Sequence, residues 1–233
     1  MSIIEMKEVS RSYSAGDNEI LALDGANLVL EQGDFIVILG PSGAGKSTML
    51  NLFGGLDSPT SGKIIVDGTD ISTLDSDQLA EYRASKVGFI FQFYNLIPTL
   101  TIYENVALVK DICKDHLDAN EVLRQVGLEG HGNKFPSQLS GGEQQRASIA
   151  RALAKNPQII LCDEPTGALD SDTGVMILRI LQNMTREHGK TVIIVTHNQN
   201  IARMADVVVR VKNGHIQSCE RRGNPQCVDE VDW

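Results

Sequence analysis

The chain has 233 residues, a length that can bury a full core as one large domain or as one domain with an inserted subdomain. Its 21 Lys and Arg stand against 30 Asp and Glu, and a formal net charge of -9 without a local basic stripe argues against nucleic acid as a partner. The four cysteines are scattered without Cys-x-x-Cys spacing, which favours reduced thiols over a disulfide framework or a zinc site.

The first predicted elements are short strands over Ile3 to Val9 and Asn27 to Glu31, followed by a buried strand over Phe35 to Leu39. Further on, Lys63 to Val66 precede an Asp-Gly pair, which is the pattern of a β-hairpin. We interpret the hairpin as antiparallel structure that lies beside a main sheet.

A glycine-rich loop follows the strand over Phe35 to Leu39 and opens a predicted helix. Glycines let several backbone N–H groups point at one anion, and the helix N-terminus adds positive potential. Lys46 is expected to reach the β- and γ-phosphates of a nucleotide, and the Ser47 hydroxyl is expected to bind Mg²⁺. The pattern G-x4-G-K-[ST] arises by chance in roughly one per cent of chains of this length. We therefore predict a nucleotide site made by Ser42, Gly43, Ala44, Gly45, Lys46, Ser47 and Thr48.

The next strand of the main sheet is predicted over Val87 to Phe91, because this near-continuous apolar run is typical of a strand covered by helices on both faces. Between Thr101 and Gln138 the apolar residues follow helical spacing, for example Val106, Val109 and Ile112. We expect a small helical insert over about residues 93–150.

The segment from Leu139 to Arg146 opens another predicted helix. Ser140 and Glu143 fit a capping box, which is a purely structural explanation for those two residues. It does not explain Gly141 and Gly142, since glycines in a first helical turn destabilise it by about 1 kcal/mol each relative to alanine. Close approach of the backbone to an anion at the positive helix end is the better account.

A buried strand over Ile159 to Cys162 ends in two carboxylates, Asp163 and Glu164. A strand end that meets solvent would explain this pattern if it stood alone. With a phosphate loop upstream, the better interpretation is an acidic partner for Mg²⁺ and a base for a water nucleophile. We assign Asp163 to Mg²⁺ and Glu164 to orienting or deprotonating the attacking water.

The last strand of the main sheet is predicted over Thr191 to Val195, directly before Thr196 and His197. Val207 to Val211 precede an Asn-Gly pair, which predicts a second hairpin that lies beside the main sheet. From Arg221 onward the chain is acidic and is expected to be loosely ordered. Trp233, its last residue, is interpreted as a disordered end rather than a docking anchor.

These motifs in this order resemble the ATP-binding cassette of an ABC transporter over nearly the whole chain. The matching segments are Tyr13 as the aromatic that stacks on adenine, Gly40 to Thr48 as Walker A, Gln92 as the Q-loop, Leu139 to Gln144 as the signature motif, Ile159 to Glu164 as Walker B, Ala168 to Asp170 as the D-loop, and His197 as the switch histidine.

The resemblance implies an α/β P-loop NTPase fold over residues 1–220, with a parallel core sheet flanked by helices, an antiparallel β subdomain and a helical insert that carries the signature. Residues 221–233 would form a flexible acidic tail. It implies an ATP hydrolase in which Glu164, His197 and Gln92 are catalytic. Ser47, Gln92 and Asp163 would hold Mg²⁺.

The resemblance further implies a head-to-tail homodimer. ATP held by Lys46 and Ser47 of one copy would meet Ser140, Gly141 and Gly142 of the other, so these three residues bind nucleotide in trans. Asp170 would also contribute to the nucleotide site. Because both copies are acidic, they repel one another without nucleotide.

The segments over 87–98 and 163–170 look most like the branch that includes the lipoprotein-release, macrolide-export and cell-division ATPases, which implies an FtsX/MacB-like integral-membrane permease as a separate partner. Apolar residues after Gln92 would form a groove for a cytoplasmic helix of that permease: Phe93, Tyr94, Leu96, Ile97, Leu100 and Ile102. No apolar stretch approaches the roughly 20 residues of a membrane span, and the N-terminus lacks a secretory signal pattern. We expect a cytoplasmic chain, peripheral on the inner face of the cell membrane.

Three other functions are compatible with a phosphate loop. A mechanical or signalling ATPase of this branch would act on a membrane protein without transport. DNA-repair and translational relatives of the cassette have long coiled coils or a second linked cassette, and this chain shows neither. A phosphate-loop kinase would not need the segment from Leu139 to Gln144.

Overall fold

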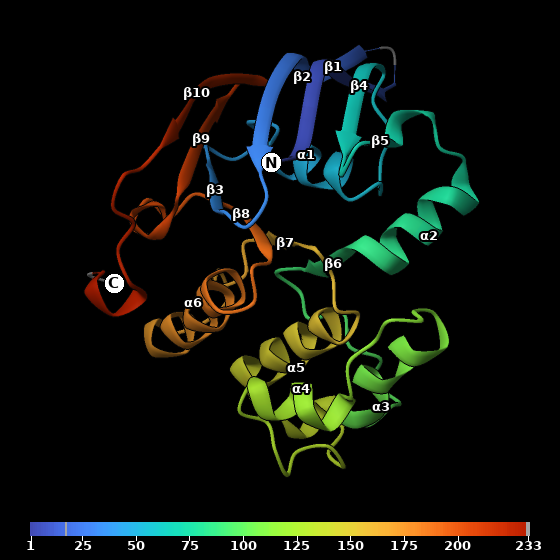
Figure 1. Cartoon of the computed structure of the whole chain (residues 1–233), viewed down its shortest axis with the longest axis vertical. Coiled ribbons are helices and arrows are strands. Elements are labelled where there is room, and N and C mark those ends of the chain that lie inside the picture. The colour runs from blue at the N-terminus through green and yellow to red at the C-terminus, as the bar shows by residue number, and fades with distance from the viewer. Residues whose placement is uncertain (17, 232–233) are drawn as a thin grey trace.

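Two sheets organise the computed structural model, which describes residues 1–16 and 18–231 (Figure 1). The larger sheet has the strand order β10-β9-β3-β8-β7-β6, and the smaller has the order β2-β1-β4-β5. In the larger sheet every neighbouring pair is parallel except β9 and β10: the strands are β3 (Phe35–Leu39), β6 (Val87–Ile90), β7 (Ile159–Asp163), β8 (Thr191–Thr196), β9 (Val207–Lys212) and β10 (His215–Arg221).

The smaller sheet is antiparallel throughout and packs above the larger one in Figure 1. It consists of β1 (Ser2–Ala15), β2 (Asn18–Glu31), β4 (Ser61–Val66) and β5 (Thr69–Asp70). The two short strands predicted near the N-terminus are parts of β1 and β2, which pair along most of their length. The predicted hairpin after Val66 is confirmed, since Val66 pairs with Thr69 across the turn.

Helices cover both faces of the larger sheet. They are α1 (Lys46–Phe53), α2 (Ser76–Lys86), α3 (Ile102–Ala107), α4 (Ala119–Gln125), α5 (Gly141–Ala154) and α6 (Ser171–Arg186), with 3-10 turns η1 (Ile71–Thr73), η2 (Leu108–Asp111), η3 (Pro136–Gln138), η4 (Ile201–Met204) and η5 (Val228–Glu230). None of the described helices is long and apolar enough to cross a membrane. The predicted α/β P-loop architecture is confirmed.

The central strand β3 explains why the larger sheet is buried on both faces. Phe35, Val37 and Leu39 pack into a core shared with α3 to α6, whereas Ile36 and Ile38 pack into a second core with α1 and the antiparallel sheet. Successive side chains of a strand point to opposite faces, so each face receives apolar residues from β3, β6, β7, β8 and β9. Buried strands of this kind hold the loops at their ends in fixed positions.

One strand lies in a different place from that predicted. The sequence predicts that Val207 to Val211 form a hairpin beside the main sheet, but β9 is a member of that sheet and runs parallel to β3, with Val37 opposite Val208. Only β10 is antiparallel, at the edge. The residues of a turn predict that the two flanking strands pair with each other. They do not reveal the second neighbour of either strand in the sheet.

The helical insert departs from its predicted spacing at one residue. Val106 and Val109 are buried as expected, whereas Ile112 is 63% exposed and Cys113 takes the inward position. The reason is that the 3-10 turn η2 ends at Asp111, so Ile112 lies beyond the last helical residue and no longer follows the helical spacing.

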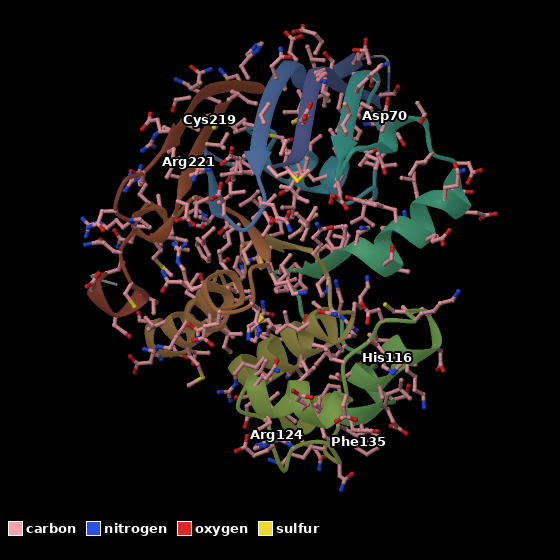
Figure 2. All side chains as sticks on the ribbon, in the orientation of Figure 1. Asp70, His116, Arg124, Phe135, Cys219 and Arg221 are labelled. Carbon is pink, nitrogen blue, oxygen red and sulfur yellow. The ribbon has the colours of Figure 1, made fainter. Side chains whose placement is uncertain are left out.

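The described part of the C-terminal tail is packed rather than loose. Arg221, labelled in Figure 2, ends β10 and pairs with the Asp34 carboxylate at 2.6 Å, and this contact raises its pKa. Val228 is fully buried against α6, and its N–H donates to Gln182 Oε1 at 3.1 Å. Val228 and Val231, two buried valines among acidic residues, thus anchor the segment. Trp233 lies outside the described residues.

Shortening Val228 tests this packing. Val228→Ala removes buried methyl groups, so we expect the free energy of unfolding to fall by about 2 kcal/mol. Val29→Ala makes the same chemical change at a residue that is 59% exposed and is expected to leave stability within about 0.5 kcal/mol. Urea unfolding of both variants measures the difference. Equal midpoints would mean that the tail does not pack on α6 in solution.

Candidate active site

A cavity of about 360 Å³ collects residues from the carboxyl ends of four neighbouring strands. Its lining consists of Ser42, Gly43, Lys46, Ser47, Gln92, Asp163, Glu164, Gly167 and His197. They follow β3, β6, β7 and β8, which lie side by side in the sheet and end at one edge. Ligands of open α/β sheets bind at this edge. Eight of these nine residues were predicted from the sequence, and Gly167 was not.

The phosphate loop is tightly packed against the antiparallel sheet. Gly45 precedes α1 with a φ of 103°, and a Cβ placed on it would lie 2.4 Å from the carbonyl oxygen of Ala22. Both the backbone conformation and the contact therefore require glycine. The Lys46 ammonium is almost buried and donates to the carbonyl oxygens of Gly40 and Pro41 at 2.9 and 3.0 Å. Ala44 is buried, and Thr48 is half-buried on α1.

Asp163 and Ser47 meet across the cavity. The Ser47 hydroxyl donates to Asp163 Oδ1 at 3.2 Å, joining the start of α1 to the end of β7. Burial raises the pKa of the Asp163 carboxyl, and the hydrogen bond from Ser47 only partly opposes this effect. A desolvated carboxylate is stabilised by a cation. The serine hydroxyl, the carboxylate and the amide oxygen of Gln92 in the same cavity are hard oxygen donors, which fit Mg²⁺.

The Glu164 carboxylate is fixed by three contacts to the end of β8. Its Oε1 accepts the His197 backbone N–H at 3.0 Å and lies 2.8 Å from His197 Nδ1, and its Oε2 accepts the Thr196 hydroxyl at 2.8 Å. Glu164 has a φ of 45°, an uncommon conformation for a residue with a side chain. The turn directs the carboxylate into the cavity. Sequence reasoning missed Thr196, although it directly precedes His197 at a strand end.

The signature residues Ser140, Gly141 and Gly142 do not line this cavity. They form the start of α5, where Ser140 and Glu143 make the predicted capping box. The Ser140 N–H and hydroxyl both donate to the Glu143 carboxylate, which lowers its pKa. A Cβ on Gly142 would lie 2.4 Å from Thr173 Cγ2 of α6. This contact gives Gly142 a packing role within the chain that the sequence did not indicate.

Asp170 and Tyr13 also lie outside the lining of the cavity. Asp170 caps α6, where its carboxylate accepts the Thr173 N–H at 3.0 Å and hydroxyl at 2.8 Å, and its pKa is lowered as a result. The Tyr13 hydroxyl donates to Asp57 at 2.7 Å, and the Arg11 guanidinium lies 4.6 Å from the centre of the Tyr13 ring. One face of that ring is therefore already covered.

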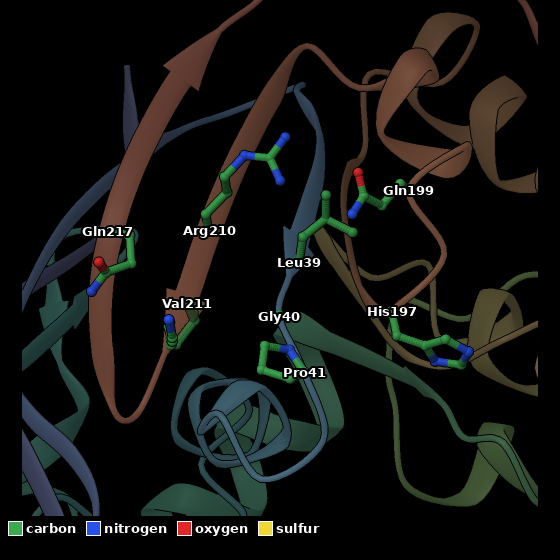
Figure 3. A pocket seen from close by; sticks show the side chains of 9 residues that line it. Leu39, Gly40, Pro41, His197, Gln199, Arg210, Val211 and Gln217 are labelled. Carbon is green, nitrogen blue, oxygen red and sulfur yellow. The ribbon is translucent and has the colours of Figure 1, made fainter.

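A second cavity, of about 450 Å³, lies on the other side of the phosphate loop (Figure 3). Figure 3 shows Arg210 of β9 and Gln199 on opposite sides of Leu39, with the His197 ring directed away from them. Among the residues that the structure describes, no aspartate or glutamate lines it. It lacks the carboxylates that the predicted chemistry needs, so the first cavity is the candidate active site.

Comparison with known proteins identifies the family. Residues 23–167 match the family model described as "ABC transporter". The chain is 46% identical over 228 residues to the uncharacterized ABC transporter ATP-binding protein MJ0796 of Methanocaldococcus jannaschii, covering 94% of this chain and 97% of that protein. It is 48% identical over 221 residues to the macrolide export ATP-binding/permease protein MacB of Mannheimia succiniciproducens, but this match covers 93% of the chain and only 34% of MacB.

A solved structure agrees with the sequence relatives. The dimeric structure of a post-hydrolysis state of the cassette MJ0796, bound to ADP and Pi, superposes with a TM-score of 0.88 at 44% identity, covering 95% of this chain and 100% of that one. The family model, the near-complete match to an ATP-binding protein and this likeness agree with the cavity at the carboxyl edge of the sheet. The chain therefore belongs to the ABC transporter family, in which it is an ATP-binding cassette and an ATPase.

Proposed function

We propose that this cassette is the ATP-hydrolysing subunit of an ABC transporter, which energises a separate membrane permease through ATP-driven head-to-tail dimerisation. The observation that supports this function best is the convergence of two contacts in one cavity. Ser47 meets Asp163 on one side, and Glu164 meets His197 on the other. A cation site and a water-activating site thus lie beside the same phosphate loop.

Phosphate binding is assigned to the loop and Lys46. The Lys46 ammonium donates to carbonyl oxygens at the base of the loop and lines the cavity, so a triphosphate placed over Ser42 and Gly43 would meet a positive charge that is held in place. Preorganised donors of this kind need little rearrangement on binding. Ser47, Asp163 and Gln92 would hold Mg²⁺, which when bound neutralises charge on the phosphates.

Hydrolysis is assigned to Glu164, with His197 and Gln92 in support. The contacts from Thr196 and His197 hold the Glu164 carboxylate still, so it can orient a water and accept its proton. His197 lies at the same edge with a side chain that is 71% exposed, where it can reach the γ-phosphate or the attacking water. Gln92 would sense the presence of the γ-phosphate.

Dimerisation is proposed because the cavity of one chain lacks the signature residues. Ser140 and Gly141 stand at the exposed start of α5, outside the cavity that holds Lys46. A second copy placed head-to-tail would bring them to the open side of the nucleotide. The related cassette MJ0796 forms a dimer bound to ADP and Pi, which supports this arrangement.

A permease partner is supported by an exposed apolar surface on the helical insert. Phe93 is 76% exposed and Ile97 is 39% exposed directly after Gln92, and Ile112 lies on the same insert. Ile102, also predicted for this groove, is fully buried and belongs to the core. MacB relatives are ATP-binding/permease proteins of which this chain spans about a third. We place the cassette at the cytoplasmic face of the membrane through such a permease.

Glu164→Gln tests the role of the base. The amide keeps the shape of the side chain but cannot accept a proton, so we expect ATP binding to persist while turnover falls about 10²- to 10⁴-fold. The variant should also accumulate as an ATP-bound dimer, measured by light scattering after size exclusion. Glu187→Gln, an exposed change on the same chain, is the control. Near-normal turnover by Glu164→Gln would remove Glu164 from the mechanism.

Lys46→Ala tests the phosphate loop. Loss of the ammonium removes the charge that faces the phosphates, so nucleotide binding should be abolished when it is followed by calorimetry. Lys63→Ala removes an exposed lysine of β4 and should bind as the parent does. An unchanged affinity of Lys46→Ala for ATP would count decisively against the assignment.

Ser140→Arg tests the trans site. A bulky cation at the start of α5 should block ATP-driven dimerisation and leave nucleotide binding to the monomer intact. Ser137→Arg adds the same charge at an exposed residue of η3 nearby and should dimerise normally. Size exclusion with ATP, in the Glu164→Gln background, compares the two variants. A Ser140→Arg protein that still dimerises would exclude the head-to-tail contact.

A further inference from the structure

Gln145 is a buried side chain of α5 that the proposed chemistry does not use. It is 1% exposed and lies on the first turns of the helix that begins with the signature residues. Its Nε2 donates to the carbonyl oxygen of Pro165 at 3.0 Å and to that of Phe91 at 3.3 Å. Phe91 precedes Gln92 and Pro165 follows Glu164, so one amide group touches both segments that carry hydrolytic residues.

The two carbonyls lie where neighbouring strands part. β6 and β7 are paired in register up to Ile90 and Cys162, and the chain beyond them enters the Gln92 loop on one side and the Glu164 turn on the other. The Gln145 amide bridges the two segments just beyond the last paired residues. A peptide carbonyl that leaves a sheet needs such a donor when it is buried.

The two acceptors fix the orientation of the Gln145 amide. Both acceptors are carbonyl oxygens, so the NH₂ end of Gln145 must face them, and its Oε1 points elsewhere. Within residues 1–16 and 18–231, that buried Oε1 has no hydrogen-bond partner. An unpaired buried acceptor is unfavourable. Because the Oε1 of Gln145 is unpaired, we attribute the presence of glutamine at this position to the hydrogen bonds that its NH₂ group donates.

The backbone next to Pro165 is the strained part of the site. Glu164 has a φ of 45°, and its turn is closed by the Gly167 N–H, which donates to the Glu164 carbonyl at 3.0 Å. A Cβ placed on Gly167 would lie 3.4 Å from the Gln92 amide nitrogen, so the two loops are in contact beside the cavity. A small shift of either loop would move Glu164 relative to Gln92.

We propose that Gln145 is a positioning residue that sets the Glu164 turn and the Gln92 loop against each other and against the signature helix. This inference rests on the proposed roles of Glu164 and Gln92. In each copy, α5 presents Ser140 and Gly141 to the nucleotide of the other copy, while Gln145 on the same helix holds the copy's own hydrolytic loops. Docking of the signature helix is thereby linked to the geometry of hydrolysis.

The chain supplies a matched control in Gln182 of α6. Gln182 is also buried, and its amide bridges backbone groups, with Nε2 donating to the Gln226 carbonyl at 3.0 Å and Oε1 accepting the Val228 N–H at 3.1 Å. It ties the C-terminal tail to α6 and touches neither loop of the cavity. Loss of Gln182 should affect stability alone.

Gln145→Met and Gln182→Met keep side-chain length and remove the amide. Three quantities are measured on each protein: the thermal unfolding midpoint, the affinity for ATP by calorimetry, and the single-turnover rate of hydrolysis at saturating ATP with Mg²⁺. For Gln145→Met we expect a rate about 10- to 100-fold below the parent, the scale on which misplacement of reacting groups acts. Its ATP affinity should stay within about threefold, because Lys46 and the phosphate loop are unchanged. For Gln182→Met we expect only a lower unfolding midpoint.

The outcomes distinguish a failure of the positioning role of Gln145 from a failure of the proposed function. A Gln145→Met rate equal to that of Gln182→Met, with both proteins folded at the assay temperature, would overturn the positioning role. Loss of ATP affinity in parallel with rate would also overturn it, since that result indicates a general collapse of the site. Glu164→Gln is run alongside: if it retains turnover, the proposed function itself fails, whatever Gln145→Met does.

Discussion

Parallel pairing of β3, β8, β7 and β6 is the constraint on which the rest of the molecule depends. Each of these strands is apolar along its length and is covered on both faces, so their order and register are held by two separate cores. Because parallel strands end at one edge, this pairing brings Lys46, Gln92, Glu164 and His197 together from distant parts of the sequence. The loops themselves have little freedom, since each begins at a buried strand end.

The strained turn at Glu164 shows how this frame is used. A residue with a side chain in the left-handed region costs about 1–3 kcal/mol and persists only where its surroundings hold it. Here β8 supplies the contacts, through the Val195 carbonyl that accepts the Glu164 N–H at 3.0 Å and through Thr196 and His197 at the carboxylate. The sheet thus stabilises a conformation that the local sequence would not adopt alone, and the conformation aims the carboxylate at the cavity.

Helix α5 connects the two halves of the proposed cycle. Its first turn is capped by Ser140 and Glu143 and packs through Gly142 against Thr173, next to the Asp170 cap of α6. Its next turn reaches the loops of the active site through Gln145. In the proposed dimer, this helix would face the other copy at one end and its own hydrolytic loops at the side, and so would transmit the state of one to the other without a large rearrangement of the core.

Local chemistry allowed much of this to be predicted from the sequence: the apolar run from Phe35 to Leu39, the phosphate loop, the capping box and both hairpin turns each depend on residues close together in the chain. The tertiary structure alone decided the place of β9 inside the main sheet, the exposure of Ile112 and the anchoring of Val228 on α6. The bridge made by Gln145 belongs to the same group. These features depend on contacts between residues far apart in the chain, which composition and periodicity do not record.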